Sequence, residues 1–124
     1  MVIINESDRT RGNPEGQTAK VFHFGELKGL FNVSTGSRKV KTTTDGREYV
    51  AITREGFFRP KKLYSDYYSY TFFGAEMPYA IFFNGGIALH GTTAINMLGK
   101  RASGGCVRFD PKDIKVINDL MRTT

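Results

Sequence analysis

Short stretches of alternating apolar and polar residues run through the first half of the chain. Residues 19–24 (Ala-Lys-Val-Phe-His-Phe) predict a strand, and residues 30–33 predict its partner after a glycine-bounded turn at 25–29. Residues 49–53 predict a third strand. The N-terminal segment 1–18 is polar, with a strong turn or loop signal at residues 12–16 (Gly-Asn-Pro-Glu-Gly), and the polar stretch 34–46 predicts a loop.

The second half is more strongly patterned. Residues 78–83 predict a core strand, residues 84–86 (Asn-Gly-Gly) a tight turn, and residues 87–90 the second strand of a hairpin. Residues 106–109 predict a further strand. In that strand Val107 and Phe109 would share one face, and Cys106 and Arg108 the other.

Two segments predict helices. A short helix is expected near 93–98, closed by Gly99. A longer one is expected near 111–122, where Asp110 can cap the first turn and Pro111 fits the first position. Its apolar stripe consists of Ile114, Ile117 and Leu120 or Met121. The pattern therefore predicts a mainly β fold in a single domain over residues 1–124.

Composition adds little to this picture. The chain is 40% hydrophobic and 24% charged, which is ordinary for a globular domain of 124 residues. A net charge of +6 suits an anionic partner such as nucleic acid, a membrane surface or a cell-wall polymer, but the basic residues fall in small groups typical of solvated surface. Basic and aromatic residues mingle between 57 and 83 without a nucleic-acid recognition motif, so we expect no nucleic-acid partner.

Targeting and metal signals are also weak. No stretch approaches the ~18 apolar residues of a transmembrane helix, and no signal peptide is visible at the start of the chain. A leader already cleaved would leave no trace. A single cysteine excludes an internal disulfide, and Cys106 with two histidines offers few metal ligands, so we expect neither metal nor cofactor.

The candidate chemistry centres on Cys106 and His90. A thiol attacks as its thiolate and needs a base, and histidine has a suitable pKa near neutrality. Residues 103–105 are small, so a substrate carbonyl could approach backbone N–H groups that would hold an oxyanion. The alternatives are a buried, inert cysteine, and for His23, the other histidine, a strand position on the face shared with Val21.

Three segments follow one another in a recognisable order: residues 90–92 (His-Gly-Thr), 98–99 (Leu-Gly) and 102–108 (Ala-Ser-Gly-Gly-Cys-Val-Arg). This order resembles the signature of the L,D-transpeptidase catalytic domain (YkuD-like) family. Upstream, residues 33–36 (Val-Ser-Thr-Gly), 53–56 (Thr-Arg-Glu-Gly) and 77–83 (Met-Pro-Tyr-Ala-Ile-Phe-Phe) are also similar. The similarity covers roughly residues 30–121 and implies a compact catalytic fold of the β-sandwich or barrel-like kind.

The resemblance implies a peptidoglycan L,D-transpeptidase, a carbapenem target that acts in the cell envelope after export. Cys106 would attack the diaminopimelate–D-alanine bond of a tetrapeptide stem, form a thioester and pass the acyl group to an amine, giving a 3→3 cross-link. In some members the acceptor is a lipoprotein lysine, a free D-amino acid or water. An L,D-carboxypeptidase and a non-catalytic peptidoglycan-binding module are the alternatives. We expect a monomer whose partners are peptide stems.

The resemblance also implies roles for individual residues. His90 would be the base, oriented by the backbone carbonyl of Gly91, and the N–H groups of Gly105 and Cys106 would hold the oxyanion. Arg108 would bind a substrate carboxylate or a neighbouring loop.

Other positions have supporting roles or depart from the family pattern. We expect Ser103 to support the turn by hydrogen bonding. Tyr79 could line the cleft, although core packing is the first interpretation. Gly104 stands where the family carries a second histidine, which would affect substrate positioning, and Arg54 replaces a proline in a turn. Many members have another strand after the last helix; here we expect the N-terminal segment to complete the sheet, or the domain to be minimal.

Overall fold

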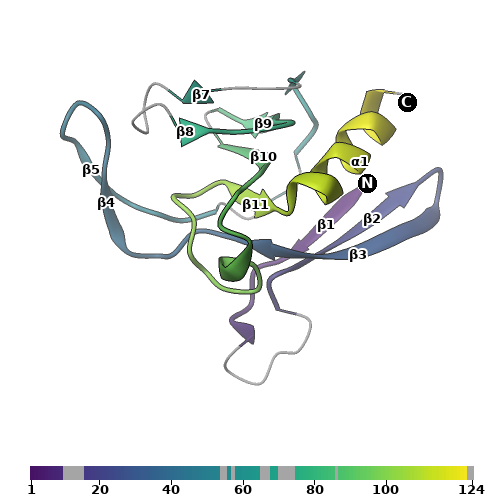
Figure 1. The fold of residues 1–124 in the computed structure, drawn as a ribbon, viewed down its shortest axis with the longest axis horizontal. Coiled ribbons are helices and arrows are strands. Elements are labelled where there is room, and N and C mark those ends of the chain that lie inside the picture. Colours follow the sequence, from purple (N-terminus) through teal and green to yellow (C-terminus); the bar gives the residue numbers. More distant parts are fainter. Residues whose placement is uncertain are drawn as a thin grey trace.

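The fold is mainly β, as predicted, with one α-helix at the end of the described chain (Figure 1). The computed structural model describes residues 1–9, 16–53, 56, 58–64, 68–69, 75–85 and 87–122. Its elements are β1 (Val2–Asn5), β2 (Thr18–His23), β3 (Glu26–Ser34), β4 (Val40–Thr42), β5 (Glu48–Val50), β6 (Lys62–Leu63), β7 (Tyr68–Ser69), β8 (Ala75–Glu76), β9 (Ile81–Asn84), β10 (Ile87–Gly91), a 3-10 helix (Ile95–Met97), β11 (Val107–Phe109) and α1 (Pro111–Arg122).

A curled seven-stranded sheet organises the molecule, in the order β1-β2-β3-β11-β10-β9-β6. Neighbouring strands are antiparallel except β10 and β11, which are parallel. In Figure 1 the sheet curls so that β9 and β10 lie across from β1, β2 and β3. Two separate hairpins, β4–β5 and β7–β8, complete the strands of the described chain.

The main core lies between the curled sheet and α1. Apolar side chains from five strands and the helix meet there, and their removal from water is the chief favourable term in folding. Phe109 on β11 and Ile114 and Ile117 on α1 are among its fully buried members. The buried residues of this core are Ala19, Val21, Val33, Ile81, Leu89, Val107, Phe109, Ile114 and Ile117.

The predicted C-terminal helix is confirmed at Pro111–Arg122. The Asp110 carboxylate accepts a hydrogen bond of 3.0 Å from the backbone N–H of residue 112, as expected of a cap. Buried Asn118 links the helix to the chain next to β6 and β9. Its side-chain amide donates hydrogen bonds to the carbonyls of Tyr64 (3.1 Å) and Tyr79 (3.2 Å).

Several sequence predictions need correction. Residues 34–46 were expected to form a loop, but β4 lies there at Val40–Thr42 and pairs with β5. The outer residues of β4 are exposed and its half-buried residue is Lys41, so this strand lacks the apolar face that makes a strand visible in a sequence. The strand expected at 49–53 is present only at its start, because β5 ends at Val50. The helix expected near 93–98 is only the 3-10 turn Ile95–Met97, which buries no residue.

At the N-terminus, β1 pairs antiparallel with β2 and forms one edge of the sheet, which agrees with the expectation that the N-terminal segment completes the sheet. The strand expected at 30–33 extends back to residue 26, which shortens the turn at 25–29. The predicted turn at residues 54–55, including Arg54, and much of the aromatic segment lie outside the described residues. Among the described helices, none has the length and apolarity needed to cross a membrane.

Candidate active site

A cleft of about 890 Å³ opens on the face of β10 and β11 that points away from the main core. Side chains alternate along both strands: Leu89 and Val107 enter the core, whereas His90 and Arg108 line the cleft. The β4–β5 hairpin and residues 76–78 form its walls. The cleft is lined by Lys39, Val40, Lys41, Thr42, Tyr49, Glu76, Met77, Pro78, Ile87, His90, Gly91, Thr92, Thr93, Ala94, Gly104, Cys106 and Arg108.

Cys106 lies in a tight turn directly before β11. The thiol is only 9% exposed, and its Sγ accepts a hydrogen bond of 3.4 Å from the backbone N–H of Ala88 on β10. Ser103 braces the turn from within: its hydroxyl donates to the carbonyl of Cys106 (2.5 Å) and accepts from the N–H of Gly105 (3.1 Å). Ser103 therefore has the turn-supporting contacts expected from the sequence.

A second set of hydrogen bonds supports this turn from a segment that is distant in sequence. The Thr53 hydroxyl donates to the carbonyl of Gly105 (2.7 Å) and accepts from the N–H of Gly36 (2.9 Å). Gly36 also bridges to Ser103, which extends β3 to the turn that holds Cys106. A side chain at Gly36 would collide with the carbonyl of Ala51, so only glycine allows this close backbone approach.

His90 is held in one orientation. Its Nδ1 lies 2.6 Å from the carbonyl oxygen of Gly91, and because a carbonyl only accepts, Nδ1 carries the proton and Nε2 is left as the basic nitrogen. The ring is 7% exposed. Burial, opposed by the hydrogen bond to Gly91 and assisted by the Arg108 charge, lowers the pKa of His90 to about 4. At pH 7 the imidazole is neutral.

Burial has the opposite effect on the thiol. It raises the pKa of Cys106 above the ordinary value, although the Ala88 N–H and the Arg108 charge partly oppose the rise. The resting site therefore holds a neutral thiol and a neutral imidazole, with no preformed thiolate–imidazolium pair. This arrangement can perform chemistry in which the thiol loses its proton as Sγ attacks.

Arg108 sits directly beside His90, since the two residues are in register on β11 and β10. Its side chain is half-buried and lines the cleft. Within the described residues we find no ion pair to its guanidinium, which leaves its charge available to a ligand in the cleft. Arginine is well suited to a carboxylate because its fork can bind both oxygens.

Of the other predicted site residues, one lines the cleft and two do not. Gly104 lines the cleft, whereas Gly105 is buried and its N–H is used by Ser103, which weighs against the expected oxyanion role of Gly105. Tyr79 packs against the main core and is not among the residues that line the cleft. Core packing, the first interpretation of Tyr79, therefore fits the structure better than substrate contact.

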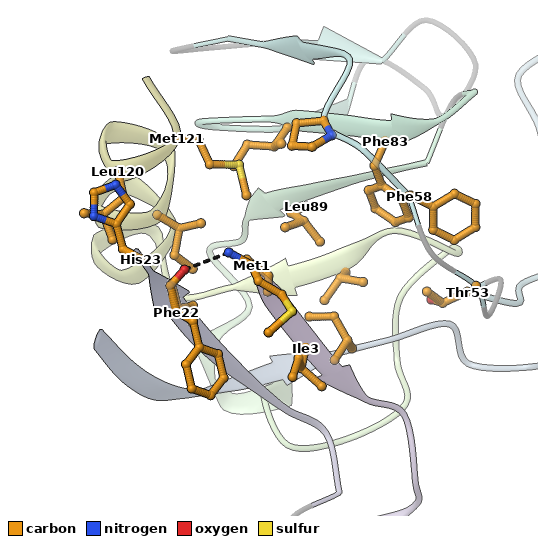
Figure 2. Close-up of a pocket in the computed structure, with 18 of the residues that line it drawn as sticks. Met1, Ile3, Phe22, His23, Thr53, Phe58, Phe83, Leu89, Leu120 and Met121 are labelled. Atoms are coloured by element: carbon orange, nitrogen blue, oxygen red, sulfur yellow. Dashed lines mark hydrogen bonds between the residues drawn. The ribbon is translucent and has the colours of Figure 1, made fainter. Parts of the chain in front are cut away.

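His23 lies in a different cavity, of about 740 Å³ and largely apolar lining, shown in Figure 2. His23 and Leu120 of α1 both line this cavity, and the N-terminal amine of Met1 donates to the carbonyl of Phe22 at 2.7 Å (Figure 2). Cys106 does not line this cavity. His23 is thus away from the cleft, which leaves His90 as the candidate base.

Tyr49 is the cleft residue that sequence reasoning missed. Its hydroxyl donates a hydrogen bond of 3.0 Å to the carbonyl of Gly104, two residues before the thiol. Tyr49 belongs to β5 (Glu48–Val50) and begins the strand expected at 49–53, so the sequence did place it on a strand. No local pattern indicated that this strand packs beside the turn that holds Cys106.

Comparison with known proteins assigns the family. The model of the L,D-transpeptidase catalytic domain (YkuD) matches residues 2–124. The chain therefore belongs to the L,D-transpeptidase catalytic domain family. No curated protein sequence matches the chain significantly.

Solved structures show the same fold. An L,D-transpeptidase from Xylanimonas cellulosilytica has a TM-score of 0.71 and 27% identity, with 82% of this chain and 48% of that chain covered. One from Mycobacterium smegmatis has a TM-score of 0.67 and 17% identity, covering 83% and 49%. Another, solved in complex with imipenem, has a TM-score of 0.65 and 19% identity, covering 83% and 49%. The chain thus spans about half the length of these structures.

Proposed function

We propose that this protein is a peptidoglycan L,D-transpeptidase with Cys106 as nucleophile and His90 as base. The observation that carries the proposal is that the thiol and an imidazole oriented by Gly91 line one cleft, in a chain of this family. The neutral state of His90 at pH 7 supports its role, because only the neutral ring can take a proton.

In the first half-reaction, Sγ of Cys106 attacks the carbonyl that joins diaminopimelate to the terminal D-alanine of a tetrapeptide stem. Nε2 of His90 takes the thiol proton and gives it to the leaving amine. The carbon–nitrogen bond breaks, D-alanine departs and a thioester remains. The N–H of Cys106 is the proposed oxyanion donor, since it lies on the residue that attacks.

In the second half-reaction, an amine of another stem attacks the thioester. His90 takes a proton from this amine and returns it to the leaving sulfur, which restores the thiol and gives a 3→3 cross-link. Arg108 binds a carboxylate of the stem, as its position beside His90 and its charge in the cleft support. No metal or cofactor takes part. The peptidoglycan substrate implies action at the cell wall. We propose that the protein acts there as a monomer through this single domain.

Incubation with a disaccharide-tetrapeptide, followed by mass spectrometry, tests the proposal. We expect a product with the mass of two stems less one D-alanine, and no product with Cys106→Ala. Release of tripeptide alone would show that water is the acceptor and would assign an L,D-carboxypeptidase. No product and no acylation of Cys106 would contradict both enzyme assignments and favour a non-catalytic wall-binding module.

A further inference from the structure

The Tyr49 hydroxyl lies close to the position that a side chain at Gly104 would take. Gly104 lies in, and Tyr49 borders, the turn of residues 103–106 directly before β11, here called the nucleophile turn. A Cβ built on Gly104 would lie 3.0 Å from the Tyr49 hydroxyl oxygen, closer than such a carbon normally sits to its neighbours. The same hydroxyl donates its hydrogen bond to the Gly104 carbonyl. A side chain at residue 104 would therefore force the Tyr49 hydroxyl to shift by a few tenths of an ångström from its present position.

Tyr49 reaches the turn from a hairpin whose outer residues are exposed on both strands. On β5 its neighbours Glu48 and Val50 are exposed, whereas Tyr49 is half-buried. Its cross-strand partner Lys41 on β4 is also half-buried, and both line the cleft. One face of the β4–β5 hairpin thus forms a wall of the cleft, and the Tyr49 hydroxyl joins that wall to the turn that carries the thiol.

The phenol also lies in the electrostatic environment of the site. Burial raises the pKa of Tyr49, the Cys106 sulfur raises it further, and Arg108 partly opposes both. The hydroxyl therefore stays protonated and remains a hydrogen-bond donor at neutral pH.

We propose that Tyr49 is a positioning residue of the acyl-donor site, and that the absence of a side chain at Gly104 leaves room for its hydroxyl at this hydrogen-bonding position. By hydrogen bonding to the Gly104 carbonyl, the phenol holds the β4–β5 hairpin closed against the nucleophile turn, so that a peptide stem meets a formed wall beside Cys106. This role rests on the proposed transpeptidase function. In this role Tyr49 transfers no proton.

Tyr49→Phe tests the role by removing one hydroxyl and keeping the ring. We expect KM for the tetrapeptide stem to rise about three- to tenfold, the value of one net hydrogen bond, with kcat within about twofold. The reaction of Cys106 with iodoacetamide, a reagent too small to need the wall, should keep its rate. Glu48→Gln, an equally conservative change on the exposed face of the same strand, should leave all three unchanged.

Gly104→Ala tests the pairing. We expect it to raise KM as Tyr49→Phe does, because the added methyl displaces the hydroxyl, and we expect the double variant to be no worse than either single one. Effects that add would show that the two positions act independently and would overturn the proposal. An unchanged KM in Tyr49→Phe, or a fall confined to kcat, would overturn it as well.

A measurement without substrate separates this proposal from the proposed function. In hydrogen exchange, the backbone amides of residues 40–50 should exchange faster in Tyr49→Phe than in the parent or in Glu48→Gln. Equal exchange in all three would reject the role of Tyr49. If the parent releases no D-alanine, the proposed function fails, and the exchange result still decides whether Tyr49 holds the hairpin.

Discussion

At the scale of single residues, burial acts on both partners of the proposed proton transfer. It raises the pKa of the Cys106 thiol and lowers that of His90 to about 4, so each group keeps its neutral form. A buried thiolate–imidazolium pair would have to repay the desolvation of two charges, which close attraction often fails to do. The proposed chemistry is therefore one in which charge develops on Sγ only as the carbonyl is attacked.

The pH dependence of acylation follows from the neutral imidazole. We expect the rate of carbapenem acylation to fall on the acid side with an apparent pKa near 4, well below the ordinary histidine value, because protonation removes the base. His90→Asn should lower this rate at least ~100-fold at pH 7. The loss of carbapenem absorbance, followed from pH 3.5 to 8, measures both effects.

The matched control is His23→Gln, which changes the histidine outside the cleft and should keep the parent rate and profile. An acid limb near the ordinary histidine pKa, or near-normal acylation in His90→Asn, would contradict the assignment of His90 as base.

The same pKa shift predicts a pH-dependent stability. The unfolded chain binds a proton at His90 more readily than the folded one, because the pKa is higher in the unfolded chain. The contribution of neutral His90 to the free energy of unfolding is therefore fully present above about pH 6.5 and is lost as the pH falls towards 4. The loss amounts to about 3 kcal/mol over that interval, from the size of the shift. Denaturant unfolding of the parent and His90→Gln at pH 7, 5.5 and 4.5 measures it. Equal pH slopes in the two proteins would refute the prediction.

At the scale of elements, the nucleophile turn depends on segments far apart in sequence. The end of β3 reaches it through Gly36 and the segment after β5 through Thr53, while Ser103 supports it from within. These contacts fix the backbone before Cys106, so the thiol position is set by hydrogen bonds as well as by packing.

Thr53→Val isolates one of these contacts with little change in shape. The Gly36 N–H and the Gly105 carbonyl, both buried, would lose their partner, which should cost about 1–3 kcal/mol of unfolding free energy. Thr42→Val is the control, because Thr42 is exposed and should change stability by less than ~0.5 kcal/mol. Equal costs for the two variants in denaturant unfolding would show that the Thr53 hydroxyl does not hold the turn.

Elements with strong local signals were predictable. The C-terminal helix has a cap at Asp110 and an apolar stripe, and the hairpin of β9 and β10 has apolar strands around a glycine turn. β4 was not predictable, because its outer positions are exposed and its half-buried residue is a lysine, so no apolar face distinguishes it from a loop. Of the strand expected at 49–53, only its start lies in β5. β1 at the edge of the sheet agrees with the expectation that the N-terminal segment completes the sheet.

At the scale of the whole molecule, the parallel pair of β10 and β11 sets His90 and Arg108 side by side and brings Cys106 beside Ala88. The signature residues predicted the candidate pair, because they are close enough in sequence to be recognised together. The contact of Tyr49 with Gly104 spans 55 residues and depends on how an exposed hairpin folds back over the cleft, which no local pattern encodes.

The central claim is that Cys106 becomes acylated with the help of His90. The most direct test is to mix the protein with a carbapenem, quench early and late, and locate the adduct by intact-mass and peptide mass spectrometry. We expect one adduct per chain, on the peptide that contains Cys106, formed much more slowly in His90→Asn and not at all in Cys106→Ala. An adduct on another residue, or no adduct on a folded parent protein, would contradict the claim.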